Sequence, residues 1–318
     1  MTGLLRAELL RLTSRRVVRW LFAGAIVVIL LVQGIAFAKS SKHLKTVPGS
    51  FSVAVTEDVT QLISDKCRAR HGDDEKAYQE CVGVELAQLT QPGVVDKRYD
   101  ATRLLPDVAR AVVVGVAIIG FIVGATSIGG EWGAGTMQAL LFWETRRVRV
   151  VLAKAAALVA VLLAFLVVAE VVGLATTVLN GALRGITDGI DGSRWATSLL
   201  GVARGAWIVT FTGLFGFAVA GLARITAAAL GVSFVYFVIL ENLVRGLRPG
   251  WIRFLVSDNI AAVLTKGADI RTVHTGSDGN QFETVFRLTT QRASLTLAVY
   301  LVVLVGAFVV SFQRRDVT

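Results

Sequence analysis

The sequence predicts an all-α polytopic membrane protein with six transmembrane helices. Hydrophobic residues make up 54% of its 318 residues, and the mean hydropathy is +0.65, whereas soluble domains contain about 45–50% apolar residues. Long apolar runs recur along the chain, and about 20 consecutive apolar residues suffice to cross a bilayer as a helix. Cation-rich segments separate several runs, which is typical of loops on the cytoplasmic side.

Residues 1–20 are expected to form an amphipathic interfacial helix. Leu5, Leu9 and Leu12 recur at the spacing of one helical face, and five arginines accompany a single acid, Glu8. Such a helix lies along the membrane surface, where its arginines contact lipid phosphates.

The first span is expected at residues 21–38. Two features also fit an export signal: Ser14-Arg15-Arg16 resembles a weak twin-arginine motif, and Ala36-Phe37-Ala38 resembles a cleavage site. The apolar region of about 18 residues is longer than the ~7–15 residues of a signal-peptide core. We therefore expect an uncleaved span.

Residues 39–104 are expected to form an extracellular, α-rich loop domain with a helix at Glu75–Gln88. Cys67 and Cys81 both lie in it. A disulfide between them fits an extracellular location, and two free thiols are the alternative. His71 lies between them, but these residues do not complete a four-ligand metal site, so we expect no metal.

The remaining apolar runs predict five more spans, of which the second is expected to begin near Pro106 and Asp107. A polar loop is expected at residues 180–198. Between the fifth and sixth spans, Trp251–Leu264 is too short to cross the membrane and predicts a re-entrant element. Gly276–Asn280 then predicts the turn of a small β-hairpin. The expected ranges are 109–128, 148–179, 199–222, 225–240 and 295–312 for the spans, and 241–292 for the re-entrant and hairpin region.

The distribution of cations predicts the orientation. Arginines and lysines gather before the first span, between the second and third spans, at Arg224, and at Arg314 and Arg315. By the positive-inside rule, both termini then lie in the cytoplasm and the cysteine-containing domain lies outside a plasma (inner) membrane.

The segment between the second and third spans, residues 129–147, is called the coupling segment below. Gly129, Gly130, Gly133 and Gly135 allow sharp turns, and Thr136 is expected to cap a short helix at 137–143. Met137, Leu140, Leu141 and Glu144 recur at the spacing of one helical face. A tight turn with interfacial aromatic anchors, including Trp132, is the alternative.

The coupling segment carries a family resemblance. The pattern Gly-Glu-Trp-x-x-Gly-Thr-Met-x-x-Leu-Leu, followed by Arg-Arg-x-Arg-Val and Ala-Lys, spans residues 130–154 and resembles membrane subunits of type-2 ATP-binding-cassette exporters. The resemblance implies a coupling helix that docks on a cytoplasmic ATPase, with the N-terminal helix also in contact. The extracellular domain is longer than in compact members. The docking residues it implies are Glu131, Trp132, Thr136, Met137, Leu140, Leu141, Glu144, Arg146 and Arg147.

These features predict a permease subunit that forms half of a translocation pathway. The chain has no Gly-x-x-x-x-Gly-Lys-Ser/Thr loop, so we expect no cofactor on this chain and ATP-Mg on separate ABC ATPase subunits. A second permease subunit, identical or homologous, is expected to complete the pathway. No aromatic-rich basic motif predicts nucleic-acid binding, although the net charge is +10. A membrane scaffold or sensor with an extracellular ligand-binding domain is the alternative function.

Polar residues within the spans are further candidates. Glu170 lies in the third apolar run and is interpreted as a pathway or gating residue, or as a carboxyl packed within the bundle. Glu241 and Asn242 end the fifth run and either line the pathway or form a solvated span end. The spans contain no His-Glu-x-x-His motif, aspartate pair or Ser/His arrangement, so no catalytic residue is predicted.

Overall fold

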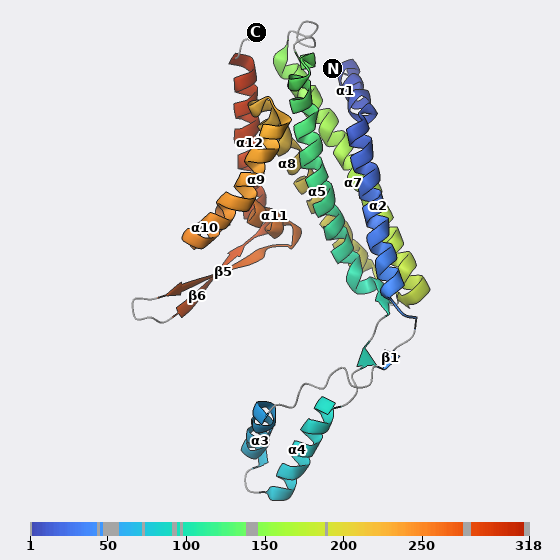
Figure 1. Cartoon of the computed structure of the whole chain (residues 1–318), viewed down its shortest axis with the longest axis vertical. Helices are drawn as coiled ribbons and strands as arrows, with labels where there is room; N and C mark the ends of the chain where they lie inside the picture. Colours follow the sequence, from blue (N-terminus) through green and yellow to red (C-terminus); the bar gives the residue numbers. More distant parts are fainter. Residues whose placement is uncertain are drawn as a thin grey trace.

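A computed structural model describes residues 2–42, 45–46, 57–71, 74–90, 94–95, 98–137, 146–187, 190–275 and 281–314. Within these ranges, six helical segments are long and apolar enough to cross a membrane, which confirms the predicted all-α polytopic fold. The two termini lie at one end of the bundle (Figure 1), called the termini end below; the opposite end is called the distal end. The spans are α2 (Arg16–Lys39), α5 (Ala101–Gly133), α7 (Arg147–Arg184), α8 (Gly192–Ala223), Thr226–Leu247 and α12 (Thr290–Arg314).

The core of the bundle is formed by α5, α7 and α8. About half of the apolar stretch of each is buried, against 6% for α2 and 17% for α12. The backbones of α5 and α8 approach closely at glycines: a Cβ on Gly124 would lie 2.0 Å from the carbonyl oxygen of Gly213. A Cβ on Gly216 would likewise lie 2.3 Å from the carbonyl oxygen of Phe121. Small residues at such contacts allow membrane helices to pack tightly.

The N-terminal amphipathic segment is shorter than expected. Helix α1 (Thr2–Ser14) ends before Arg15, which has extended backbone angles, and α2 begins at Arg16. Residues 16–20, the last quarter of the arginine-rich segment, therefore belong to the first span.

The second span begins five residues earlier than the expected Pro106. Asp100 caps α5, because its carboxylate accepts hydrogen bonds from the Arg103 N–H at 3.1 Å and the Thr102 hydroxyl at 2.6 Å. Pro106 instead lies inside the helix. The cap sits in β3 (Tyr99–Asp100), which pairs in parallel with β4 (Gly185–Ile186).

The expected polar loop at 180–198 is likewise much shorter. Helix α7 continues to Arg184, and α8 begins at Gly192. Asp191 caps α8 through a hydrogen bond from the Arg194 N–H at 2.9 Å. A carboxylate in this position satisfies an N–H group that has no partner within the helix.

The fifth span is longer than its apolar run. Arg224, with a left-handed φ of 61°, closes the turn between α8 and α9 (Thr226–Phe234). A π-helical turn, η1 (Val235–Leu240), then joins α9 to α10 (Glu241–Leu247).

Two short helices and a hairpin follow the fifth span, as predicted. They are η2 (Pro249–Phe254), α11 (Val256–Leu264), β5 (Ala268–Thr275) and β6 (Gln281–Leu288). The strands pair antiparallel with Thr275 opposite Gln281. Helix α11 packs against α8 and α12.

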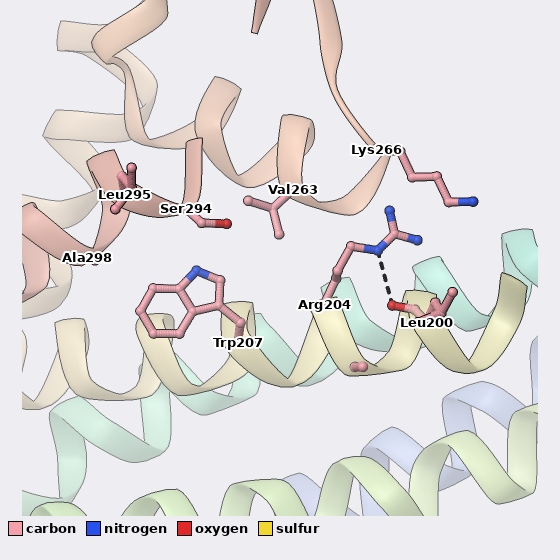
Figure 2. A pocket seen from close by; sticks show the side chains of 9 residues that line it. Leu200, Arg204, Trp207, Val263, Lys266, Ser294, Leu295 and Ala298 are labelled. Carbon is pink, nitrogen blue, oxygen red and sulfur yellow. Dashed lines mark hydrogen bonds between the residues drawn. The ribbon is translucent and has the colours of Figure 1, made fainter. Parts of the chain in front are cut away.

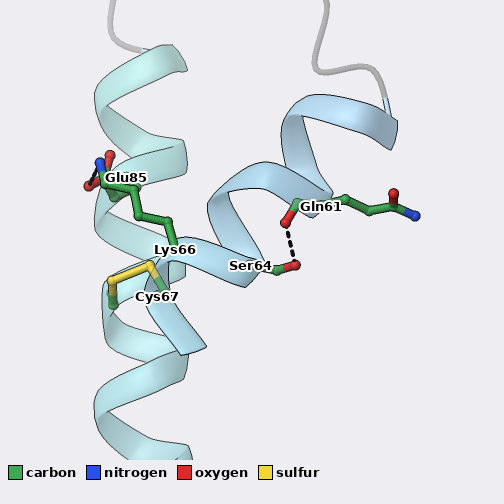
Figure 3. The surroundings of a disulfide bond; sticks show 6 residues. Gln61, Ser64, Lys66, Cys67 and Glu85 are labelled. Carbon is green, nitrogen blue, oxygen red and sulfur yellow. Dashed lines mark hydrogen bonds and ion pairs between the residues drawn. A yellow bond between two sulfur atoms is a disulfide. The ribbon is translucent and has the colours of Figure 1, made fainter. Parts of the chain in front are cut away.

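The cysteine-containing domain extends beyond the distal end of the bundle (Figure 1). It consists of α3 (Glu57–His71) and α4 (Glu75–Thr90), and the short strands β1 (Lys45–Thr46) and β2 (Val94–Val95) pair where it joins the spans. A disulfide between Cys67 and Cys81 joins the two helices (Figure 3). Lys66 and Glu85 form an ion pair of 3.0 Å beside it.

Candidate functional site

Five charged side chains meet at the termini end of the bundle and are called the Glu131 cluster: Glu8, Arg11, Arg15, Glu131 and Lys154. Lys154 Nζ donates hydrogen bonds to both carboxylate oxygens of Glu8, at 2.9 and 2.8 Å. The same nitrogen lies 2.8 Å from Glu131 Oε2, an ion pair without hydrogen-bond geometry. Arg15 Nη2 donates to Glu131 Oε1 at 2.6 Å. The cluster thus joins α1, α5 and α7.

The Glu131 cluster is buried at its centre. The side chains of Glu131 and Lys154 are only 3% and 4% exposed. Removing one member of a buried ion pair typically costs about 3–5 kcal/mol, because the remaining charge has lost its partner. The cluster therefore fastens its three helices together. Glu131 itself is covered by its own chain, so any contribution it makes to docking is through positioning rather than contact.

Arg15 connects the cluster to the backbone of α5. Its Nη1 donates to the carbonyl oxygens of Thr126 and Ser127 at 3.1 and 3.2 Å. A guanidinium carries five N–H donors and so serves a carboxylate and two carbonyls together. The junction between α1 and α2 is thereby fixed to the helix that leads into the coupling segment.

Trp132 fastens the same end of α5 to the opposite side of the bundle. The Arg224 guanidinium lies 4.6 Å from the centre of its ring, and Phe312 of α12 contacts the ring edge-on with centroids 6.0 Å apart. One turn earlier, a Cβ on Gly129 would lie 2.8 Å from the backbone nitrogen of Thr226. Helix α5 is therefore held by α9 and α12 as well as by α1 and α7.

The structure describes the two edges of the coupling segment. The Thr136 hydroxyl lies 3.4 Å from the Glu131 carbonyl oxygen, and Met137 is fully buried. Leu140, Leu141 and Glu144 lie outside the described residues, as does most of the expected helix at 137–143.

On the other edge, Arg146 is exposed at the start of α7. Arg147 Nη1 donates to the carbonyl oxygens of Phe312 and Gln313 at 3.2 and 3.4 Å. The C-terminal turn of α12 is thus tied to the first residue of α7. Arg146 is the more exposed of the two, and it is therefore the residue used below to test docking.

Glu170 lies within α7 and is 3% exposed. Among the described residues, neither of its carboxylate oxygens has a hydrogen-bond partner. An ionised carboxyl is costly at such a position. A pathway or gating role for Glu170 stays a prediction.

Glu241 does not form a solvated span end, since it is only 1% exposed. It accepts hydrogen bonds from the N–H of Ser257, at 3.2 Å, and from the Ser257 hydroxyl, at the first turn of α11. Arg245 forms ion pairs with both Glu241, at 3.5 Å, and Asp258, at 2.8 Å. Asn242 is exposed and donates to the Val238 carbonyl at 2.8 Å. Glu241 thus holds α10 against α11, and its pathway role stays a prediction.

Sequence reasoning missed Gln33, a buried residue of α2. Its amide donates to the Thr177 hydroxyl at 2.7 Å and accepts from the Tyr99 hydroxyl at 2.7 Å. The Asn180 side chain donates a hydrogen bond to the backbone carbonyl of Gln33 at 3.2 Å. A lone glutamine inside an apolar run was the available signal, because polar groups in such runs face other helices.

Six spans, with the termini end of α5 fastened to α1, α7, α9 and α12, define a multi-pass membrane protein. Residues 12–317 match the model of the ABC-2 family transporter proteins. The chain belongs to this family and is a membrane permease component of an ABC transporter. No curated protein matches the sequence.

Proposed function

We propose that this chain is the permease subunit of an ATP-driven exporter, forming half of the translocation pathway. One observation carries the proposal beyond family membership. The coupling segment joins α5 to α7 in the sequence, and the described residues at its two edges are fastened to α1, α9 and α12. A partner that pushes the coupling segment would therefore move several spans together.

The partner in this proposal is an ABC ATPase that binds ATP-Mg on the cytoplasmic side. ATP binding would displace the coupling segment, and the Glu131 cluster and Trp132 would transmit the displacement to the spans. In energetic terms, ATP binding shifts the population between two arrangements of the bundle. The cation-rich termini end supports a cytoplasmic location for both termini in a plasma (inner) membrane.

A second permease subunit, identical or homologous, would complete the pathway. Helix α2 and the segment Thr226–Leu247 leave most of their apolar surface uncovered, with 6% and 17% of their apolar stretches buried. In a membrane, this uncovered apolar surface would contact either lipid or a second subunit.

Affinity purification from mildly solubilised native membranes tests the proposal. We expect an ABC ATPase to co-purify with the wild-type chain. Arg146→Glu should release it, because the exposed cation next to the coupling segment is inverted. Arg287→Glu, which inverts another exposed cation, on the β-hairpin, should not. Recovery of no ABC ATPase, or equal recovery with Arg146→Glu, would contradict the proposal.

A membrane scaffold or sensor is the second candidate, on one observation. The disulfide-linked pair α3 and α4 extends beyond the bundle (Figure 1), where an external ligand could reach it. This function predicts that the chain purifies without an ABC ATPase and that an external ligand binds the isolated membrane protein.

A further inference from the structure

A cavity in the distal half of the bundle combines apolar walls with a cationic edge. It measures about 680 Å³ and lies between α8, α11 and α12 (Figure 2). Trp207, Val263 and Leu295 contribute apolar walls, and Arg204 and Lys266 lie together at one edge. The cavity is thus amphipathic, with its charge confined to one end.

The two cations at this edge, Arg204 and Lys266, come from different elements of the fold. An adjoining cavity of about 190 Å³ shares Arg204 and Lys266 and is also lined by Arg110. Arg110 is balanced by Asp107, 2.5 Å away. Arg204 donates from Nε to the Leu200 carbonyl of its own helix, at 3.1 Å. Within the described ranges, neither Arg204 nor Lys266 forms an ion pair with a carboxylate.

The cationic edge lies at the depth of lipid head groups. Arg224 closes α8 at the termini end, and Arg204 precedes it by twenty residues along the helix, a rise of about 30 Å. This distance equals the thickness of the hydrocarbon core, about 30 Å. Trp207 lies about 4.5 Å closer to the membrane centre than Arg204, at the start of the apolar region.

We propose that this cavity binds a membrane lipid with an anionic head group, taken from the distal leaflet. Arg204 and Lys266 donate to the head-group phosphate, for which a guanidinium is well suited. The acyl chain lies along Trp207 and Leu295. A free phosphate would use only the charged edge, whereas the cavity continues into apolar walls. Convergence of cations from two separate elements distinguishes the site from a single arginine that extends to the membrane surface.

Fluorescence quenching of the full-length chain in nanodiscs tests the proposal. The probes are phosphatidylglycerol and phosphatidylcholine with brominated acyl chains, titrated into unbrominated phosphatidylcholine. The difference between wild type and Trp207→Phe isolates the signal of Trp207 among the six tryptophans. Each cation near an anionic lipid strengthens binding by a factor of about five. Because the site has two cations, phosphatidylglycerol should quench Trp207 at about thirtyfold lower concentration than phosphatidylcholine.

Charge variants complete the test. Arg204→Gln combined with Lys266→Gln should abolish the preference, whereas Arg204→Lys, which keeps the charge, should retain most of it. The matched control is Arg248→Gln combined with Arg287→Gln, which removes the same amount of charge from exposed positions outside the cavity. This control should retain the full preference for phosphatidylglycerol. Equal quenching of the wild type by both lipids, or a preference that persists without Arg204 and Lys266, would overturn the proposal. Displacement of brominated lipid by soluble glycerol phosphate would also overturn it.

Discussion

Glu131 and Lys154 lie 2.8 Å apart in the buried interior of the bundle, although they belong to different helices on either side of the coupling segment. Lys154 also donates a hydrogen bond to Glu8 of α1, and Glu131 also accepts one from Arg15. The family pattern that marks the coupling segment therefore contains residues of two kinds. Glu131 and Lys154 are buried inside the chain, whereas Arg146 is exposed at the start of α7.

Loss of the central cation should destabilise the termini end. Lys154→Met leaves the carboxylates of Glu8 and Glu131 without their shared partner, and we expect a loss of about 3–5 kcal/mol. Thermal unfolding followed by size-exclusion chromatography in detergent measures the change. Arg6→Met, which removes an exposed cation from α1, is the control and should have little effect. Equal midpoints for the two variants would show that the cluster contributes no net stability.

Close packing between α5 and α8 should make Gly124 intolerant of a side chain. A methyl group at Gly124 would collide with the Gly213 carbonyl, so Gly124→Ala should cost at least about 1–3 kcal/mol. Gly115→Ala is a matched control on the same helix, because nothing lies within 4 Å of its added Cβ. The ratio of folded to aggregated protein after heating compares them. A Gly124→Ala variant as stable as Gly115→Ala would contradict the packing described.

The cap of α5 should depend on pH. The hydroxyl of Thr102 is the main cause that lowers the pKa of Asp100 from its ordinary value of 3.8, and the Arg103 N–H adds to it. A lowered pKa in the folded state means that the carboxylate contributes stability above pH 3.8, and this contribution is lost as the pH falls through the lower folded value.

Hydrogen exchange in the first turn of α5, corrected for intrinsic rates, measures this effect. Protection should be constant from neutral pH down to about the ordinary pKa and fall below it. Asp100→Asn should remove the step in protection while retaining part of the cap. A first turn whose protection is the same on both sides of pH 3.8 would argue against the cap as the cause.

The sequence predicted the six spans and the β-hairpin well because both depend on local patterns. Apolar length marks a span wherever it occurs, and the glycine-rich turn at 276–280 marked the strands on either side. Helix ends were less predictable: Pro106 was a plausible helix start, but Asp100 accepts the hydrogen bonds that fix it.

The arrangement of the Glu131 cluster was beyond sequence reasoning. Glu8 and Lys154 are separated by 146 positions, and no local pattern shows that their side chains meet. The family resemblance implied that Glu131 is a docking residue, and in the structure its side chain is buried beside Arg15 and Lys154. The isolated acid among the arginines of residues 1–20 was the one sequence signal for the cluster.

Transmission of movement through the Glu131 cluster can be measured by hydrogen exchange on the purified complex with its ABC ATPase, with and without ATP. We expect ATP to change exchange in α1 and in the first turns of α7 in the wild-type complex. In Glu131→Gln, the ATPase should remain bound, because residue 131 is buried, but the ATP-dependent change in α1 should be lost. An ATP-dependent change in α1 that is as large in Glu131→Gln as in the wild type would contradict transmission through the cluster.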